Sequence, residues 1–110
     1  MAADEKLTAA LRAALARRTD VVEKKMFGGL TLMVAGHMCC GAIANDLMFR
    51  VGPERYAACL KERHARPMDF TGKPIKGMVF VAPEVAAKPK EVAKWVDWSL
   101  QFVASLPVRT

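Results

Sequence analysis

Between Val21 and Val51, four short β-prone runs follow one another, and each is closed by residues typical of a tight turn. The runs are VVEKKMF, LTLMVA, MCCGAI and LMFRV, and the turns after them are Gly28-Gly29, Gly36-His37, Asn45-Asp46 and Gly52. Short β-prone runs joined by glycine or Asn-Asp turns are typical of antiparallel hairpins. This segment therefore predicts a four-strand antiparallel meander, and the rest of the chain must pack against it.

Helical patterns lie on both sides of the meander. Asp4 is a suitable N-cap for a first helix that runs to about Arg18. The sequence GMVFVA, residues 77–82, predicts a fifth strand. From Pro89 to Leu106, apolar residues recur at i, i+3, i+4 and i+7, which is the clearest amphipathic helix in the chain.

A further helix is predicted between the meander and the fifth strand. Gly52 precedes it, Pro53 suits its first position, and Tyr56, Ala57 and Leu60 form its expected apolar face. The predicted order is α-β-β-β-β-α-β-α, an α+β fold with a single antiparallel sheet and helices on one face. The other face is expected either to contact solvent or to pair with a second copy of the chain.

Length and composition limit the class of protein. A chain of 110 residues with 53% hydrophobic residues is predicted to form one globular domain, residues 1–110. The start carries Asp4 and Glu5 where a secretory signal would be basic, and no apolar run approaches the length of a membrane helix. Three cysteines, an odd number, argue against a disulfide framework. We therefore expect a cytoplasmic protein that contacts no membrane.

Cys39 and Cys40 are adjacent in the third predicted strand. Consecutive side chains on a strand point to opposite faces, so one thiol is expected in the core and the other on the second side of the sheet. The pair also lacks the two-to-four-residue spacing of zinc ligands. Structural packing is the preferred interpretation, with metal binding and redox sensing as alternatives. No metal or cofactor is expected.

Two histidines are candidates for catalysis. His37 lies in a predicted turn and His64 in a predicted loop, so each is expected to be an exposed histidine and not a general base. No Ser/His/Asp or Cys/His constellation can be assembled, and we expect no catalytic residues and no enzyme activity.

The segment RHARPMDFTGKPIK, residues 63–76, is predicted to be a long irregular loop, which in a compact domain is usually functional or disordered. Met68, Phe70 and Ile75 alternate with polar residues, so the loop is expected to be ordered with Phe70 buried and Asp69 accepting hydrogen bonds. The residues expected to form an interaction surface are Arg66, Asp69, Lys73 and Lys76, with Lys24 and Lys25 from the first strand. The alternative is a connector whose charges are only solvated.

The net charge of +6 is concentrated in the middle of the chain. The basic residues between positions 61 and 76 are Lys61, Arg63, Arg66, Lys73 and Lys76. Such a cluster is compatible with nucleic acid or another acidic partner. It lacks the interleaved aromatic residues and the helix-turn-helix pattern of specific nucleic-acid binders, so at most weak binding is expected.

Three segments resemble the N-terminal domain of the TfoX/Sxy family of bacterial competence regulators. They are EKKMFGGLTLMVAGHMCCG, DLMFRVGPERYAACL and HARPMDFTGKPIKGMVFVAPE, with KKMFGG at Lys24–Gly29 and RPMDFTG at Arg66–Gly72 as the most specific motifs. The resemblance spans about Asp4 to Leu106. It implies an α+β domain with one antiparallel sheet, similar to the fold of type III secretion chaperones, and a role in regulating transcription beside a DNA-bound activator.

Three functions follow from these features. The leading hypothesis is a non-enzymatic regulatory module that acts through protein contacts, with transcription machinery, a regulator or a second copy of the chain as partner. The first alternative is a direct, non-specific nucleic-acid binder that uses the mid-chain basic cluster. The second is a small-ligand binder or enzyme that uses His64, Arg66 and Asp69 of the 63–76 loop.

Overall fold

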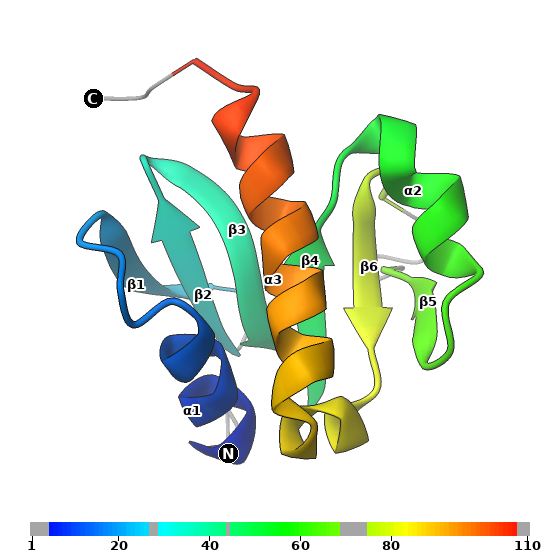
Figure 1. Ribbon diagram of the computed structural model, residues 1–110, viewed down its shortest axis with the longest axis horizontal. Coiled ribbons are helices and arrows are strands. Elements are labelled where there is room, and N and C mark those ends of the chain that lie inside the picture. The colour runs from blue at the N-terminus through cyan, green and yellow to red at the C-terminus, as the bar shows by residue number, and fades with distance from the viewer. Residues whose placement is uncertain (1–4, 27–28, 44, 69–74, 108–110) are drawn as a thin grey trace.

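The computed structural model describes residues 5–26, 29–43, 45–68 and 75–107, and it shows one sheet with helices over one of its faces (Figure 1). The strands are β1 (Val21–Met26), β2 (Gly29–Val34), β3 (His37–Ile43), β4 (Asp46–Arg50), β5 (Ala65–Pro67) and β6 (Met78–Val81). Their order across the sheet is β1-β2-β3-β4-β6-β5, and every neighbouring pair is antiparallel. The predicted meander and the α+β class are confirmed.

Strand β5 was not predicted, because it lies in the segment that the sequence indicates to be an irregular loop. It pairs with β6 so that Arg66 is opposite Phe80. A three-residue strand shows no clear alternation, and its Pro67 is tolerated only because the strand lies at an edge of the sheet. Residues 69–74, which include Asp69, Phe70 and Lys73, lie outside the described residues.

The helices are α1 (Glu5–Ala14), α2 (Pro53–Leu60) and α3 (Pro89–Ala104), and a 3₁₀ helix, η1 (Pro83–Ala87), precedes α3. Helix α1 ends before the predicted Arg18. The amide of Leu15 bonds both the Leu11 and the Arg12 carbonyls, at 3.1 and 3.2 Å, and the following amides bond three residues back. The last turn therefore tightens into 3₁₀ geometry instead of continuing as an α-helix.

Helix α2 packs two of its three predicted face residues, Tyr56 and Leu60, against the core, but not Ala57. Cys59 is its buried residue, at 1% exposure, while Tyr56 and Leu60 are half-buried and Ala57 is exposed. The helix lies beside β5 and β6 at one edge of the sheet (Figure 1), so only a narrow stripe can reach the core. The prediction for Ala57 was wrong for this reason.

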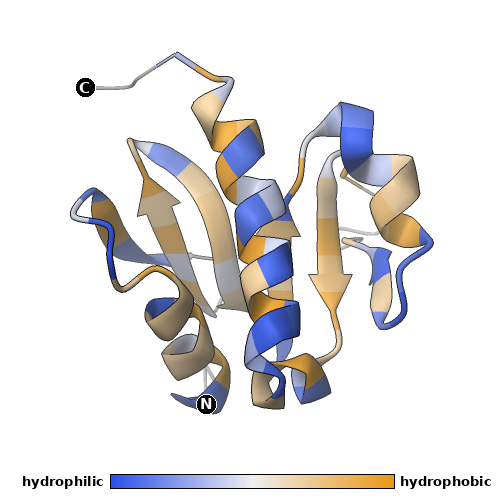
Figure 2. Ribbon diagram, viewed as in Figure 1, coloured by the Kyte–Doolittle hydropathy of each residue, from blue (hydrophilic) through white to orange (hydrophobic). Residues whose placement is uncertain are grey.

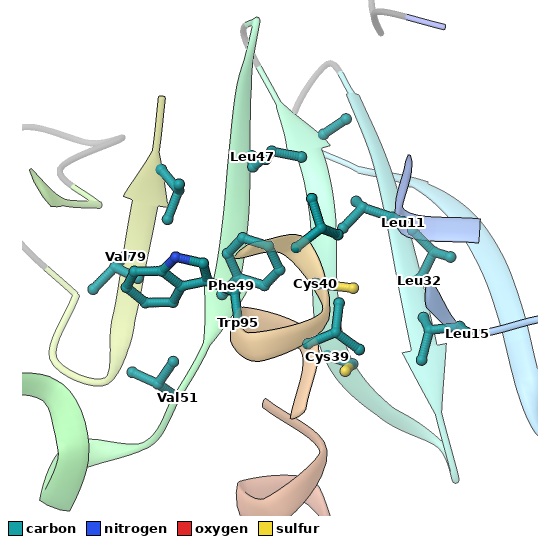
Figure 3. Packing of buried hydrophobic residues seen from close by; sticks show 14 of the residues in the cluster. Leu11, Leu15, Leu32, Cys39, Cys40, Leu47, Phe49, Val51, Val79 and Trp95 are labelled. Atoms are coloured by element: carbon teal, nitrogen blue, oxygen red, sulfur yellow. The ribbon is translucent and has the colours of Figure 1, made fainter. Parts of the chain in front are cut away.

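The main core lies between the sheet and the helices. Trp95 of α3 is fully buried and stacks on Phe49 of β4, with ring centroids 5.6 Å apart (Figure 3). The apolar spacing of α3 predicts a core stripe that is confirmed in its buried residues, Val92, Trp95, Val96, Ser99 and Val103. Phe102 and Leu106, which the same spacing includes, are only half-buried. The exposed side of the same helix is hydrophilic (Figure 2).

The opposite face of the sheet carries a second apolar cluster. Ile43, Met48, Met68 and Phe80 are buried there, and Met38 and Met78 pack against them. Met68 follows β5, so the chain itself contributes to covering this face. This face is therefore neither fully wet nor left entirely to a second copy.

Candidate functional site

The two adjacent thiols lie at an irregularity of the sheet. Strand β2 pairs with β3 through Leu32 opposite Cys40 and Met33 opposite Met38, so Cys39 is an extra residue without a partner on β2. An extra residue of this kind is a β-bulge, which interrupts the alternation of side chains. Cys39 and Cys40 are both 0% exposed and belong to the same helix-side core cluster. The expectation that they point to opposite faces was wrong.

The thiols affect one another directly. A hydrogen bond from the Cys40 thiol, helped by the charges of Arg18 and Arg50, lowers the pKa of Cys39 against the opposing effect of burial. The same hydrogen bond and the burial of Cys40 raise the pKa of Cys40. Cys59 is a single thiol elsewhere in the core, and burial raises its pKa to about 11. Of the three thiols, Cys39 is therefore the first to lose its proton as the pH rises.

The predicted interaction surface does not form one patch. Lys24 and Lys25 lie on β1 and Arg66 lies on β5, which are the two opposite edges of the sheet. Five strand spacings of about 4.8 Å separate these edges by roughly 24 Å. Lys76 is exposed just before β6, and Asp69 and Lys73 lie outside the described residues.

Arg66 itself has a structural role. Its Nη1 and Nη2 donate to the two carboxylate oxygens of Asp46 at 3.3 and 2.5 Å, and its guanidinium lies 4.9 Å from the centre of the Phe80 ring. A two-pronged contact with a carboxylate fixes the orientation of the planar group. Arg66 thereby lies against Phe80 at the border of the sheet face opposite the helices, which we call the methionine-rich face after Met38, Met48, Met68 and Met78. Half of its side chain remains exposed.

Neither histidine is a simple exposed turn residue. His37 begins β3, is 8% exposed, and its Nε2 contacts the carbonyl oxygen of Pro107. His64 has a positive φ of 75°, and its Nδ1 lies 3.7 Å from the Glu84 carboxylate. The predicted exposure of His37 was wrong, because the chain after α3 returns to cover the start of β3.

A groove that the sequence did not predict lies between α2 and α3. Its cavity has a volume of about 560 Å³. The lining residues are Val51, Gly52, Pro53, Glu54, Arg55, Ala58, Gln101, Phe102 and Ser105. Gly52 has a φ of +88°, and a Cβ at this position would overlap the Phe102 ring. A glycine is therefore required where α2 meets α3.

Two residues of the groove lining, Arg55 and Phe102, take part in cation–ring contacts that extend beyond it. The half-buried Trp98 has the Arg55 guanidinium 5.9 Å and the Lys94 ammonium 5.2 Å from its ring centre. The Arg50 guanidinium lies 5.2 Å from the centre of Phe102. Arg55 also donates to Gln101 at 3.1 Å, which joins the two helices. Trp and Arg that remain partly accessible are the residue types most enriched at protein-binding hot spots.

The sequence offered only a weak signal for this groove. Trp98 and Phe102 lie four residues apart at the margin of the apolar stripe of α3. A groove forms there only because α2 lies beside α3, and the sequence pattern does not predict how these two helices are placed.

Among the described residues, no group of three or more His, Cys, Asp and Glu side chains is placed to hold a metal ion. None of the helices in the described part of the chain is long and apolar enough to cross a membrane.

The single antiparallel sheet with helices over one face defines a small α+β domain. The chain belongs to the TfoX N-terminal domain family, whose family model matches residues 13–103. Comparison with curated proteins and with solved structures gives no match. The family assignment identifies a TfoX-like regulatory domain, as the motifs at Lys24–Gly29 and Arg66–Gly72 predict.

Proposed function

We propose that this domain is a non-enzymatic regulator that binds a protein partner through the groove between α2 and α3. The observation that carries the proposal is the cavity of about 560 Å³, with Phe102 and Arg55 in its lining and Trp98 beside it. The family supports a regulatory role. As the resemblance to competence regulators implies, we place this role in the bacterial cytoplasm beside the transcription machinery.

The groove favours a partner segment with an apolar side chain next to a carboxylate. The apolar group would fill the space against Val51, Ala58 and Phe102. A carboxylate would meet Arg55, whose present partner is the neutral amide of Gln101. A charged hydrogen bond is stronger than a neutral one, so an acidic group can displace that amide.

Capture of partners from an extract of the native bacterium tests this proposal. The bait proteins are the parent domain, the groove variants Phe102→Ala and Arg55→Glu, and the control Lys24→Glu/Lys25→Glu on the far edge of the sheet. We expect one partner to be retained by the parent and the control and lost from both groove variants. Circular dichroism establishes that each bait is folded.

Two outcomes would contradict the groove as the binding site. One is a partner that the groove variants retain and the β1 variant loses, which would move the site to that edge. The other is a partner that all folded variants retain equally. Sedimentation of the isolated domain tests the second copy as a partner, since a dimer that Phe102→Ala dissociates would place that copy in the same groove.

Direct nucleic-acid binding is the second candidate. Among the described residues, the ion pairs do not include Lys24, Lys25, Lys61, Arg63 or Lys76. These charges are divided between opposite edges of the sheet, which favours weak and non-specific contacts with phosphate. Binding of duplex DNA that falls steeply with salt would support this candidate.

A further inference from the structure

We propose that Cys39 and Cys40 form a binding site for a cuprous ion, held between the two sulfur atoms as a two-coordinate bis-thiolate. The two thiols do not line the groove, although Arg50 acts on Cys39 and also contacts the Phe102 ring of the groove, and the proposal does not depend on the protein-binding function. It rests on the bulge in β3, on the burial of both thiols in one cluster and on the cations beside them.

The bulge supplies the geometry. On a regular strand, adjacent cysteines would point to opposite faces and could not share an ion. Here Cys39 is the unpaired extra residue of β3, and both thiols enter the apolar cluster that includes Leu15, Val34 and Val96 (Figure 3). The mutual interaction of the two thiols, which lowers the pKa of Cys39 and raises that of Cys40, agrees with this shared placement.

The number and type of ligands select the metal. Thiolates are soft ligands, and soft ligands favour Cu(I) and zinc over the harder divalent ions. Zinc requires a tetrahedral set of about four ligands, and no third His, Cys, Asp or Glu joins the pair in the described part of the chain. Cu(I) is satisfied by two sulfur atoms in a line, and an apolar, water-free shell protects it from other ligands.

The positive charges near Cys39 suit the negatively charged group that two thiolates and Cu⁺ would form. Binding removes one proton from each thiol, so Cu⁺ and two thiolates form a group with a net charge of −1 and release two protons. The charged groups that act on Cys39 are Arg18, Arg50 and Asp20. Asp20 is paired with Arg18 at 2.8 Å, and Arg50 has no carboxylate partner among the described ion pairs. Arg50 is therefore the cation that can balance the new charge.

The sheet is open next to the bulge. Pairing between β3 and β4 begins only at Cys40 opposite Phe49, and the first half of β3 curves away from the end of β4 (Figure 1). Arg50 lies there, donates a long hydrogen bond of 3.4 Å to the carbonyl oxygen of Met38, and has its guanidinium 5.2 Å from the centre of the Phe102 ring.

Anaerobic titration with Cu(I) against a chromophoric Cu(I) chelator tests the proposal. The proteins are the parent, Cys39→Ala, Cys40→Ala and the matched control Cys59→Ala, which removes a buried thiol outside the pair. We expect one Cu(I) per chain in the parent and the control. Loss of either ligand should weaken affinity by more than the 10- to 100-fold that removing an outer-shell partner typically costs. Affinity should rise with pH because two protons are released.

A second measurement keeps the test valid if an alanine variant folds poorly. X-ray absorption of the copper-loaded parent should show two sulfur neighbours, and Cu(I) should raise the thermal unfolding temperature of the folded parent. The proposal is overturned if Cys40→Ala and Cys59→Ala bind Cu(I) equally well. It is also overturned if the parent binds Cu(I) only after unfolding in urea.

Discussion

The two faces of the sheet are filled with different kinds of side chain. The helix-covered face carries branched and aromatic residues, among them Leu32, Val34, Leu47, Phe49, Val79 and Val81. The opposite face carries Met38, Met48, Met68 and Met78 around Ile43 and Phe80. Branched and aromatic side chains adopt few conformations, whereas methionine adapts to irregular gaps. The comparison indicates that a unique packing arrangement is specified mainly from the helix side.

Among variants that test the dominance of the helix-covered face, Trp95→Ala is expected to have the largest effect on stability. Trp95 is fully buried and contacts both Phe49 and Trp98, with the second ring centre 5.0 Å away. Truncation of a buried aromatic residue costs about 3–5 kcal/mol of unfolding free energy. Urea denaturation followed by circular dichroism measures the loss. A cost below about 1 kcal/mol would show that the helix side does not dominate stability.

Neighbouring residues on β4 sharpen the comparison. Phe49 and Met48 are both fully buried but point to opposite faces. Phe49→Leu removes the stack on Trp95 and should cost about 1–3 kcal/mol. Met48→Leu conserves volume and should cost less than about 1.5 kcal/mol. The same denaturation experiment applies to both variants, and the comparison fails if Met48→Leu is the more costly.

Much of this fold could be predicted from the sequence because local signals agree with one another. Turn residues mark the ends of β1 to β4, and the apolar period of α3 identifies its core face without reference to other elements. Strand β5 has no such local signal, since three residues ending at Pro67 become a strand only by pairing with β6. The position of β5 at the edge of the sheet opposite β1, which separates Arg66 from Lys24, could not be predicted from the sequence either.

The candidate sites were harder to predict for a related reason. A strict two-residue period separates Cys39 from Cys40, and only the pairing with β2 shows that a bulge unites them. The groove beside Trp98 depends on how α2 packs against α3, which propensity does not specify. In both cases the decisive information is how one element is placed against another, and local sequence patterns do not specify this placement.

Unpartnered hydroxyl groups provide a third test of the two faces. Within the described residues, neither the Oγ1 atom of Thr31, opposite Lys24 in the sheet, nor the Oγ atom of Ser99 in α3 has a hydrogen-bond partner, and both atoms are buried. A buried hydroxyl without a hydrogen bond lowers stability, because it loses its contacts with water on folding and gains none in return. Replacing it with an apolar group removes this penalty, so Thr31→Val and Ser99→Ala should each stabilise the fold by about 1 kcal/mol. Thermal unfolding would contradict this if either variant melted lower than the parent.

The smallest expected effects concern the ion pairs that border each face. Asp46 binds Arg66 beside the methionine-rich face, and its side chain is 15% exposed. Glu62 binds Lys94 beside Trp98 at 2.8 Å, and its side chain is 37% exposed. Exposed ion pairs contribute about 0.2–1 kcal/mol, so neither Asp46→Asn nor Glu62→Gln should alter stability by much more than this.

The order of the two ion-pair effects is the informative quantity. Arg66 meets Asp46 with two nitrogens and is held against Phe80, whereas Lys94 offers a single ammonium that Glu91 shares at 3.2 Å. A planar, two-pronged contact loses more when its carboxylate is neutralised than a point charge with a second acceptor. Asp46→Asn should therefore be the more destabilising, and its effect should persist at high salt, where exposed pairs are screened. If Glu62→Gln were equally destabilising in 1 M salt, the two-pronged geometry of the Arg66 contact would give it no advantage over the single ammonium of Lys94.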